Sequence, residues 1–274
     1  MLLNQVVTIQ KPFPFDVLDA DQGNILINRD VLTQHGILEL YERVVSELFD
    51  SLLPSLEKAA PPGFFPFTRK SGDLEVPTYD FILRLFMLQS AHQQYTHALG
   101  HLYRGHGSEI PGHLRRAIES AGIAYLSKSK PKLGDIFMSG DAMKLRNATG
   151  TKIIFPAHDL LTADLLKSIK LASELTHNNL VSFVSSVKKH EISFKDNRWA
   201  VRLTLALHGP SDLGEFLRVA LLILRAMERV LRVFAASLEL PSTSEWFGEL
   251  HQFKQRLDKL YIELDQLVNP SHSD

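Results

Sequence analysis

The stretch between Pro210 and Pro241 carries an amphipathic pattern that restricts the fold more than any other feature of this chain. Proline ends helices, and Ser211 can cap the first N–H groups of a helix that follows it. Apolar residues then recur every three or four positions, which places them together on one broad face of a helix. They are Leu213, Phe216, Leu217, Ala220, Leu221, Leu224, Met227 and Leu231. The pattern predicts a helix over 211–238 whose broad apolar face must be covered by other helices.

Similar patterns predict further helices and therefore a mainly α, single-domain helical bundle. They cover residues 30–59, 78–103, 108–126, 160–189 and 244–268, with a short helix at 133–138 in the connector 127–157. In the helix over 108–126, Ser108 is the expected cap, Pro111 lies in the first turn, and small residues allow close packing. We expect residues 31–268 to form the bundle, and residues 269–274 to be a frayed tail.

One or two small β-hairpins are expected beside the helices. Residues 1–30 predict an N-terminal arm or hairpin, with strand candidates at 6–9 and 25–27. A second hairpin is predicted from alternating residues at 191–194 and 199–207, joined by a turn at 195–197. The alternative is that the second arm leads into a helix.

Composition excludes several classes of site. The chain of 274 residues has a formal net charge of −1, so it has no global basic field, although a local basic patch is compatible with that value. It has no cysteine, which excludes disulfides, thiolate catalysis and cysteine-based metal sites. Residues 219–224 are apolar but too few to cross a bilayer, and no signal-peptide pattern is seen. We therefore expect a cytoplasmic protein with no membrane contact.

Histidines gather between His92 and His113. His97 and His101 are four residues apart, which places both on one helix face at a spacing that suits a metal ion. A metal site needs a third ligand, and twelve histidines in the chain make such a pair common by chance. We therefore expect no bound metal or other cofactor. His97 and His101 are the residues of this chain whose spacing would suit a metal ligand pair.

The remaining candidate residues are polar groups on two predicted helices. Arg115, Arg116 and Glu119 lie beside an apolar face, where they form either an ion pair or part of a site. His177, next to Asn178, interrupts an apolar pattern, and such a break usually marks a helix start, a cap or a kink. The functional alternative is that His177 faces the Arg/Glu group in a groove and acts there as an acid or base.

The run 114–126, followed by 130–137 and 174–178, resembles uncharacterised bacterial helical proteins that are themselves similar to the HEPN superfamily. The similarity covers about residues 80–240. It implies an antiparallel helical bundle that dimerises, and in many members a metal-independent ribonuclease with four to six residues between an arginine and the histidine that follows it. At that spacing before His177 this chain has Lys170, which supplies charge but no planar guanidinium fork.

We therefore expect a HEPN-like module that binds RNA, nucleotide or a protein partner in bacterial defence or stress, as a homodimer. Its predicted binding residues are Asn178, Lys170 and Arg104, the last at the start of a Gly-His-Gly turn that leads into a helix. One alternative is an active ribonuclease that uses His177 with Arg115 or Arg116 and Glu119 as catalytic residues. The other is a metal-dependent helical hydrolase that uses His97 and His101.

Overall fold

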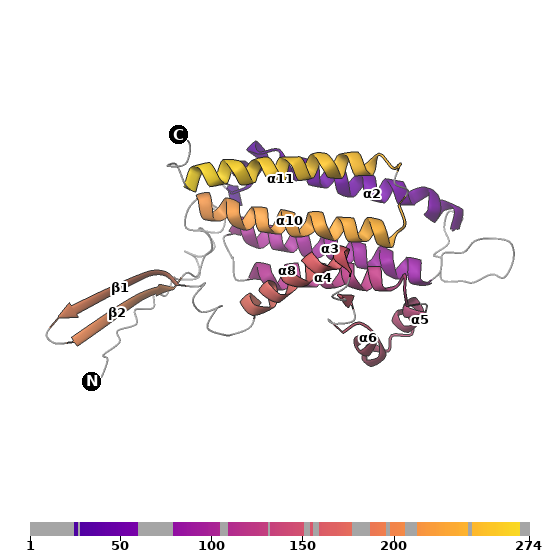
Figure 1. Ribbon diagram of the computed structural model, residues 1–274, viewed down its shortest axis with the longest axis horizontal. Helices are drawn as coiled ribbons and strands as arrows, with labels where there is room; N and C mark the ends of the chain where they lie inside the picture. Colours follow the sequence, from indigo (N-terminus) through magenta and orange to yellow (C-terminus); the bar gives the residue numbers. More distant parts are fainter. Residues whose placement is uncertain are drawn as a thin grey trace.

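The computed structural model describes most of the chain, and its bundle is helical (Figure 1). The described residues are 25–26, 28–59, 79–104, 109–130, 132–150, 154–155, 159–176, 187–195, 198–205, 213–240 and 243–268. The strand candidate at 6–9 lies outside them, and Ile25 and Leu26 are helical, which corrects the strand predicted there. Among the described residues no helix is long and apolar enough to cross a membrane.

In the described part of the chain, the bundle is built mainly of six long helices, and the short helices α5 (Leu133–Met138) and α6 (Ala142–Ala148) lie at its edge. The long helices are α2 (Ile37–Ala59), α3 (Tyr79–Arg104), α4 (Ile110–Leu126), α8 (Leu160–Thr176), α10 (Leu213–Ser237) and α11 (Trp246–Val268). In Figure 1, α2 and α11 lie side by side, and α10 packs on α11 and on α3, α4 and α8. Helix α2 also meets α3 directly, where the ring centres of Tyr41 and Tyr95 are 3.9 Å apart.

The predicted apolar face of α10 is the centre of the core. Phe216, Ala220, Leu224 and Met227 are all buried, and α10 packs against α3, α4, α8 and α11. Burying that face on four neighbours supplies much of the hydrophobic stabilisation that ordering six helices requires. The mainly α prediction is therefore confirmed.

The small residues of α4 allow the close packing that the sequence predicts. A Cβ atom at Gly122 would lie 2.9 Å from the ring of Phe155, so any larger residue there would have to displace that buried ring. Glu109 is the N-cap, one residue after the predicted Ser108, and its side chain makes no capping hydrogen bond. Pro111 occupies the first turn, where its missing N–H costs nothing.

Hydrogen bonds join helices that are distant in sequence. The indole Nε1 of Trp246 in α11 donates to the carbonyl of Val44 in α2 at 2.8 Å, within the core. Arg84 in α3 donates to Ser127 Oγ at the end of α4 and to the carbonyl of Ser237 at the end of α10, both at 2.8 Å. These bonds fix the ends of several helices relative to one another.

Two predicted helices differ from the structure. The helix expected over 30–59 is interrupted at Gly36, whose φ of +62° is a left-handed conformation that ends a helix readily. The helix expected over 160–189 does not reach its predicted end, because α8 extends to Thr176 and residues 187–189 lie in a β-strand. Helix α6, in the predicted connector, begins where the Asp141 carboxylate accepts the N–H of Lys144 at 2.9 Å.

A two-stranded antiparallel pair extends away from the bundle (Figure 1). It consists of β1 (Val187–Lys195) and β2 (Arg198–Leu205), with Ile192 opposite Val201 and an irregular register next to Val187. The pair lies where alternating residues predict a hairpin. Among the described residues its two strands pair only with each other.

Candidate functional site: an arginine-lined hollow

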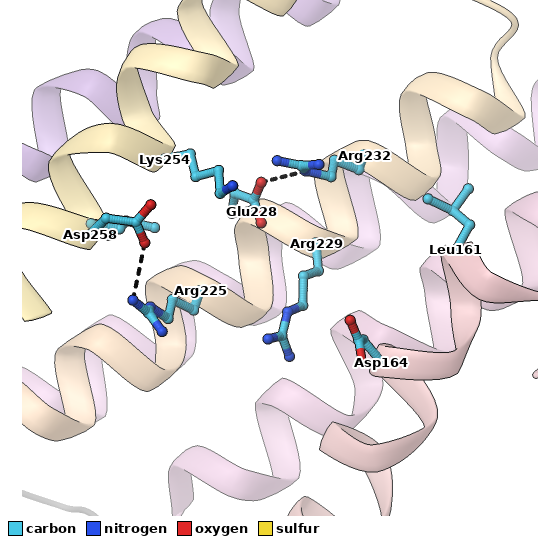
Figure 2. Close-up of a pocket in the computed structure, with 9 residues that line it drawn as sticks. Leu161, Asp164, Arg225, Glu228, Arg229, Arg232, Lys254 and Asp258 are labelled. Carbon is cyan, nitrogen blue, oxygen red and sulfur yellow. Dashed lines mark hydrogen bonds and ion pairs between the residues drawn. The ribbon is translucent and has the colours of Figure 1, made fainter.

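A hollow of about 330 Å³ opens between α8, α10 and α11 (Figure 2). Its walls carry Leu161 and Asp164 from α8, Arg225, Glu228, Arg229 and Arg232 from α10, and Lys254, Leu257 and Asp258 from α11. Four of these side chains are basic and three are acidic. The volume is at the lower end of the range found for small-ligand sites.

The helical repeat places the arginines of α10 along one edge. Arg225, Arg229 and Arg232 follow each other at intervals of four and three residues, so they share one side of the helix. The neighbouring face of α10 is buried in the core, which holds the backbone of this arginine row rigidly. A rigid helix is a precise support for side chains that bind a ligand.

Two of the arginines are neutralised by carboxylates. Nη2 of Arg225 lies 3.1 Å from Oδ1 of Asp258, and its guanidinium also lies 4.8 Å from the ring centre of Tyr261. Arg232 is paired with Glu228 one turn earlier on α10. Glu228 is only 7% exposed, so Arg232 supplies the ion-pair partner that a nearly buried carboxylate needs.

The other two cations have no carboxylate partner among the described residues. Arg229 donates from Nη1 to Ser168 Oγ at 3.4 Å, and in the described part of the chain neither Arg229 nor Lys254 forms an ion pair. Figure 2 shows the side chain of Arg229 extending from α10 into the space beside α8. Asp164 on the opposite wall pairs instead with Lys167 at 3.3 Å. The hollow therefore offers two cations that are available to an anion.

A second hollow, of about 660 Å³, adjoins the first along α10. Leu161 and Arg232 line both. Its other lining residues are Lys128, Ala235, Ala236, Glu239, Leu240, Phe247, Leu250 and His251. The lining is thus more apolar than that of the first hollow and includes the exposed ring of Phe247.

The predicted catalytic residues of α4 form a simple ion pair. Nε of Arg115 lies 3.0 Å from Oε1 of Glu119, one helical turn later, and both side chains are about one third exposed. Such a pair is worth a few tenths of a kcal/mol. Arg116 is exposed on the neighbouring side of α4.

Neither of the two predicted binding residues that the structure describes lines the hollow. Lys170 is exposed near the end of the described part of α8, and Arg104 donates to the carbonyl of Gly100 at 3.1 Å within α3. His177 and Asn178 lie outside the described residues, so the predicted group around His177 stays a prediction.

The histidine cluster contains a contact that spacing alone does not predict. The ring of His113 in α4 lies 5.3 Å from that of His97 and 5.1 Å from that of His101, both in α3. Nδ1–H of His113 donates to Oε1 of Gln94 at 2.8 Å. In the described ranges, no group of three or more His, Asp or Glu side chains is placed where it could hold a metal ion.

Burial and positive neighbours lower the pKa of His113. Desolvation is the largest cause, followed by the nearby His101, His97 and Arg116, while Glu109 opposes the shift. The ring is therefore more often neutral in the folded protein than in an unfolded chain.

The arginine-lined hollow was not anticipated from the sequence. The spacing of Arg225, Arg229 and Arg232 was visible there, but an arginine row on a helix is usually solvated. Lys254 and Asp258 reach the same hollow only because α11 packs against α10. Comparison with models of protein families, with curated proteins and with solved structures finds no match for this chain.

Proposed function

We propose that this protein is a binding module for a phosphate-bearing ligand, RNA or nucleotide, whose phosphate lies in the hollow between α8, α10 and α11. The single observation that carries the proposal is the pair of cations, Arg229 and Lys254, that line this hollow without a carboxylate partner in the described part of the chain. Phosphate contacts of this kind dominate the affinity of proteins for nucleic acids.

The chemistry of the two cations suits a phosphate. The guanidinium of Arg229 presents a planar fork that can donate two parallel hydrogen bonds to phosphate oxygens. Lys254 supplies a compact charge from α11 on the other side of the hollow. The neighbouring pairs Arg225–Asp258 and Arg232–Glu228 hold the walls in place and keep the total charge low.

The HEPN-like relationship, the homodimer, the cytoplasmic location and a role in bacterial defence belong to the same proposal and rest on the resemblance of residues 80–240. A helical bundle agrees with that resemblance, but many unrelated proteins share such a fold. Light scattering at micromolar concentration tests the dimer, and a monomer would contradict it.

Binding is tested with a fluorescently labelled single-stranded RNA and with free nucleotide, in EDTA and at low salt. We expect Arg229→Gln to weaken binding by about tenfold, because one charge-assisted phosphate contact is lost. The affinity should also fall less steeply with salt concentration in this variant than in the wild type.

Arg218→Gln is the matched control, because Arg218 is exposed on the same helix and does not line the hollow. An equal loss in both variants would contradict the proposed site. The same incubation reports RNA cleavage, and cleavage that His177→Ala abolishes would favour the ribonuclease alternative instead.

A further inference from the structure

The second hollow differs from the first in the kind of group it can hold. Ala235, Ala236, Leu240 and Leu250 give it an apolar lining, and the ring of Phe247 is 38% exposed beside them. An apolar lining with one exposed aromatic ring suits a flat, weakly polar group, since stacking on an aromatic side chain needs no particular hydrogen-bond pattern.

One cation is shared by the two hollows, because Arg232 lines both. Lys128 lines only the second, where it donates to the carbonyl of Ala236 at 2.9 Å and pairs with Glu239 at 3.5 Å. Arg229 and Ala236 are seven residues apart on α10, which is roughly 10 Å along the helix axis. That separation is comparable to the length of a mononucleotide from its phosphate to its base.

We infer that the two hollows form one mononucleotide site, in which the second hollow takes the base and stacks it on Phe247. This inference rests on the proposed function, which places the phosphate at Arg229 and Lys254. Arg232 then lies between the two ends, beside the sugar. A sugar phosphate without a base fills only the first hollow and leaves the apolar one empty.

The test compares ribose 5-phosphate with adenosine 5′-monophosphate by calorimetry on the full chain. We expect the nucleotide to bind at least tenfold more tightly, because only the nucleotide has a base to stack. Phe247→Ala should remove most of this difference and leave the affinity for ribose 5-phosphate unchanged. Phe86→Ala is the matched control, because Phe86 is an exposed phenylalanine on α3, away from both hollows.

A second variant, Ala236→Phe, fills the apolar hollow instead of removing its ring. It should also abolish the preference for the nucleotide, and an unchanged melting temperature would show that the bundle still folds. A preference that survives both variants would place the base elsewhere and overturn the inference.

The remaining outcomes separate the inference from the proposed function. Equal affinities for the two compounds, or binding of RNA without binding of the mononucleotide, would overturn the inference and leave the phosphate site in place. If neither compound nor single-stranded RNA binds, the proposed function fails and the inference fails with it.

Discussion

At the scale of single residues, His113 links acidity to the stability of the bundle. Its pKa is lowered in the folded protein by burial and by His101, His97 and Arg116. The unfolded chain therefore takes up the proton first, and the folded state loses stability as the pH falls below about 6.5. We expect the melting temperature to fall between pH 7 and pH 5, and His113→Gln to reduce that fall by about 1–2 °C, because solvent screens a partly exposed ring.

The control for this prediction is His251→Gln, since His251 is exposed on α11 and far from α4 in the sequence. An equal change in the two variants, or a melting temperature that does not depend on pH in the wild type, would contradict the role of His113. Melting followed by circular dichroism across this pH range gives the comparison directly.

At the scale of elements, alanine substitutions at two helix glycines are expected to change the free energy of unfolding in opposite directions. A Cβ atom at Gly134 in α5 would lie 2.3 Å from the backbone carbon of Tyr79, at the start of α3. The N–H of Gly134 also donates to Oδ1 of Asp80 at 2.6 Å, which anchors α5 on α3. We expect Gly134→Ala to lower the free energy of unfolding by about 1–3 kcal/mol, because backbone atoms cannot move aside.

Gly248→Ala is the matched variant, because Gly248 lies in α11 and a Cβ atom there meets no other atom within 4 Å. Alanine favours a helix over glycine, so this change should raise the free energy of unfolding by about 0.5–1 kcal/mol. Urea denaturation measures both values. A destabilised Gly248→Ala together with an unaffected Gly134→Ala would contradict the packing described here.

Periodicity was sufficient to predict the helices that bury an apolar face, but not their interruptions. The apolar pattern over 211–238 predicted the first residue of α10 to within two positions. The pattern is regular because α10 packs against four neighbouring helices. The break at Gly36 depends on one left-handed backbone angle, which periodicity does not encode. The end of α8 was missed because apolar residues resume after it and continue into β1.

The candidate site was less predictable than the fold, because it combines residues from three helices. Leu161, Arg229 and Lys254 are separated by many positions and meet only through the packing of α8, α10 and α11. The contact of His113 with His97 and His101 arises in the same way, from the pairing of α3 with α4. Spacing within one helix is visible in a sequence, whereas the partner helix is not.

At the scale of the whole molecule, α10 joins the two layers of the bundle into one core. We therefore expect a single cooperative unfolding transition in urea. The chain has two tryptophans, so Trp199→Phe leaves Trp246, buried in the core, as a fluorescent reporter. Its fluorescence and the far-ultraviolet circular dichroism should give coincident curves, and two separated midpoints would contradict a single core.

The bond between Trp246 and Val44 also has a consequence for how the protein is made. The two residues are 202 positions apart, and α2 packs on a helix that the ribosome produces only after α3, α4, α8 and α10. At ordinary rates of translation, roughly 10–40 s pass between the synthesis of α2 and the synthesis of α11, which covers part of it. During that interval the part of α2 that α11 covers, around Val44, stays exposed on the nascent chain, and we expect a chaperone that shields apolar helices to raise the yield of folded protein.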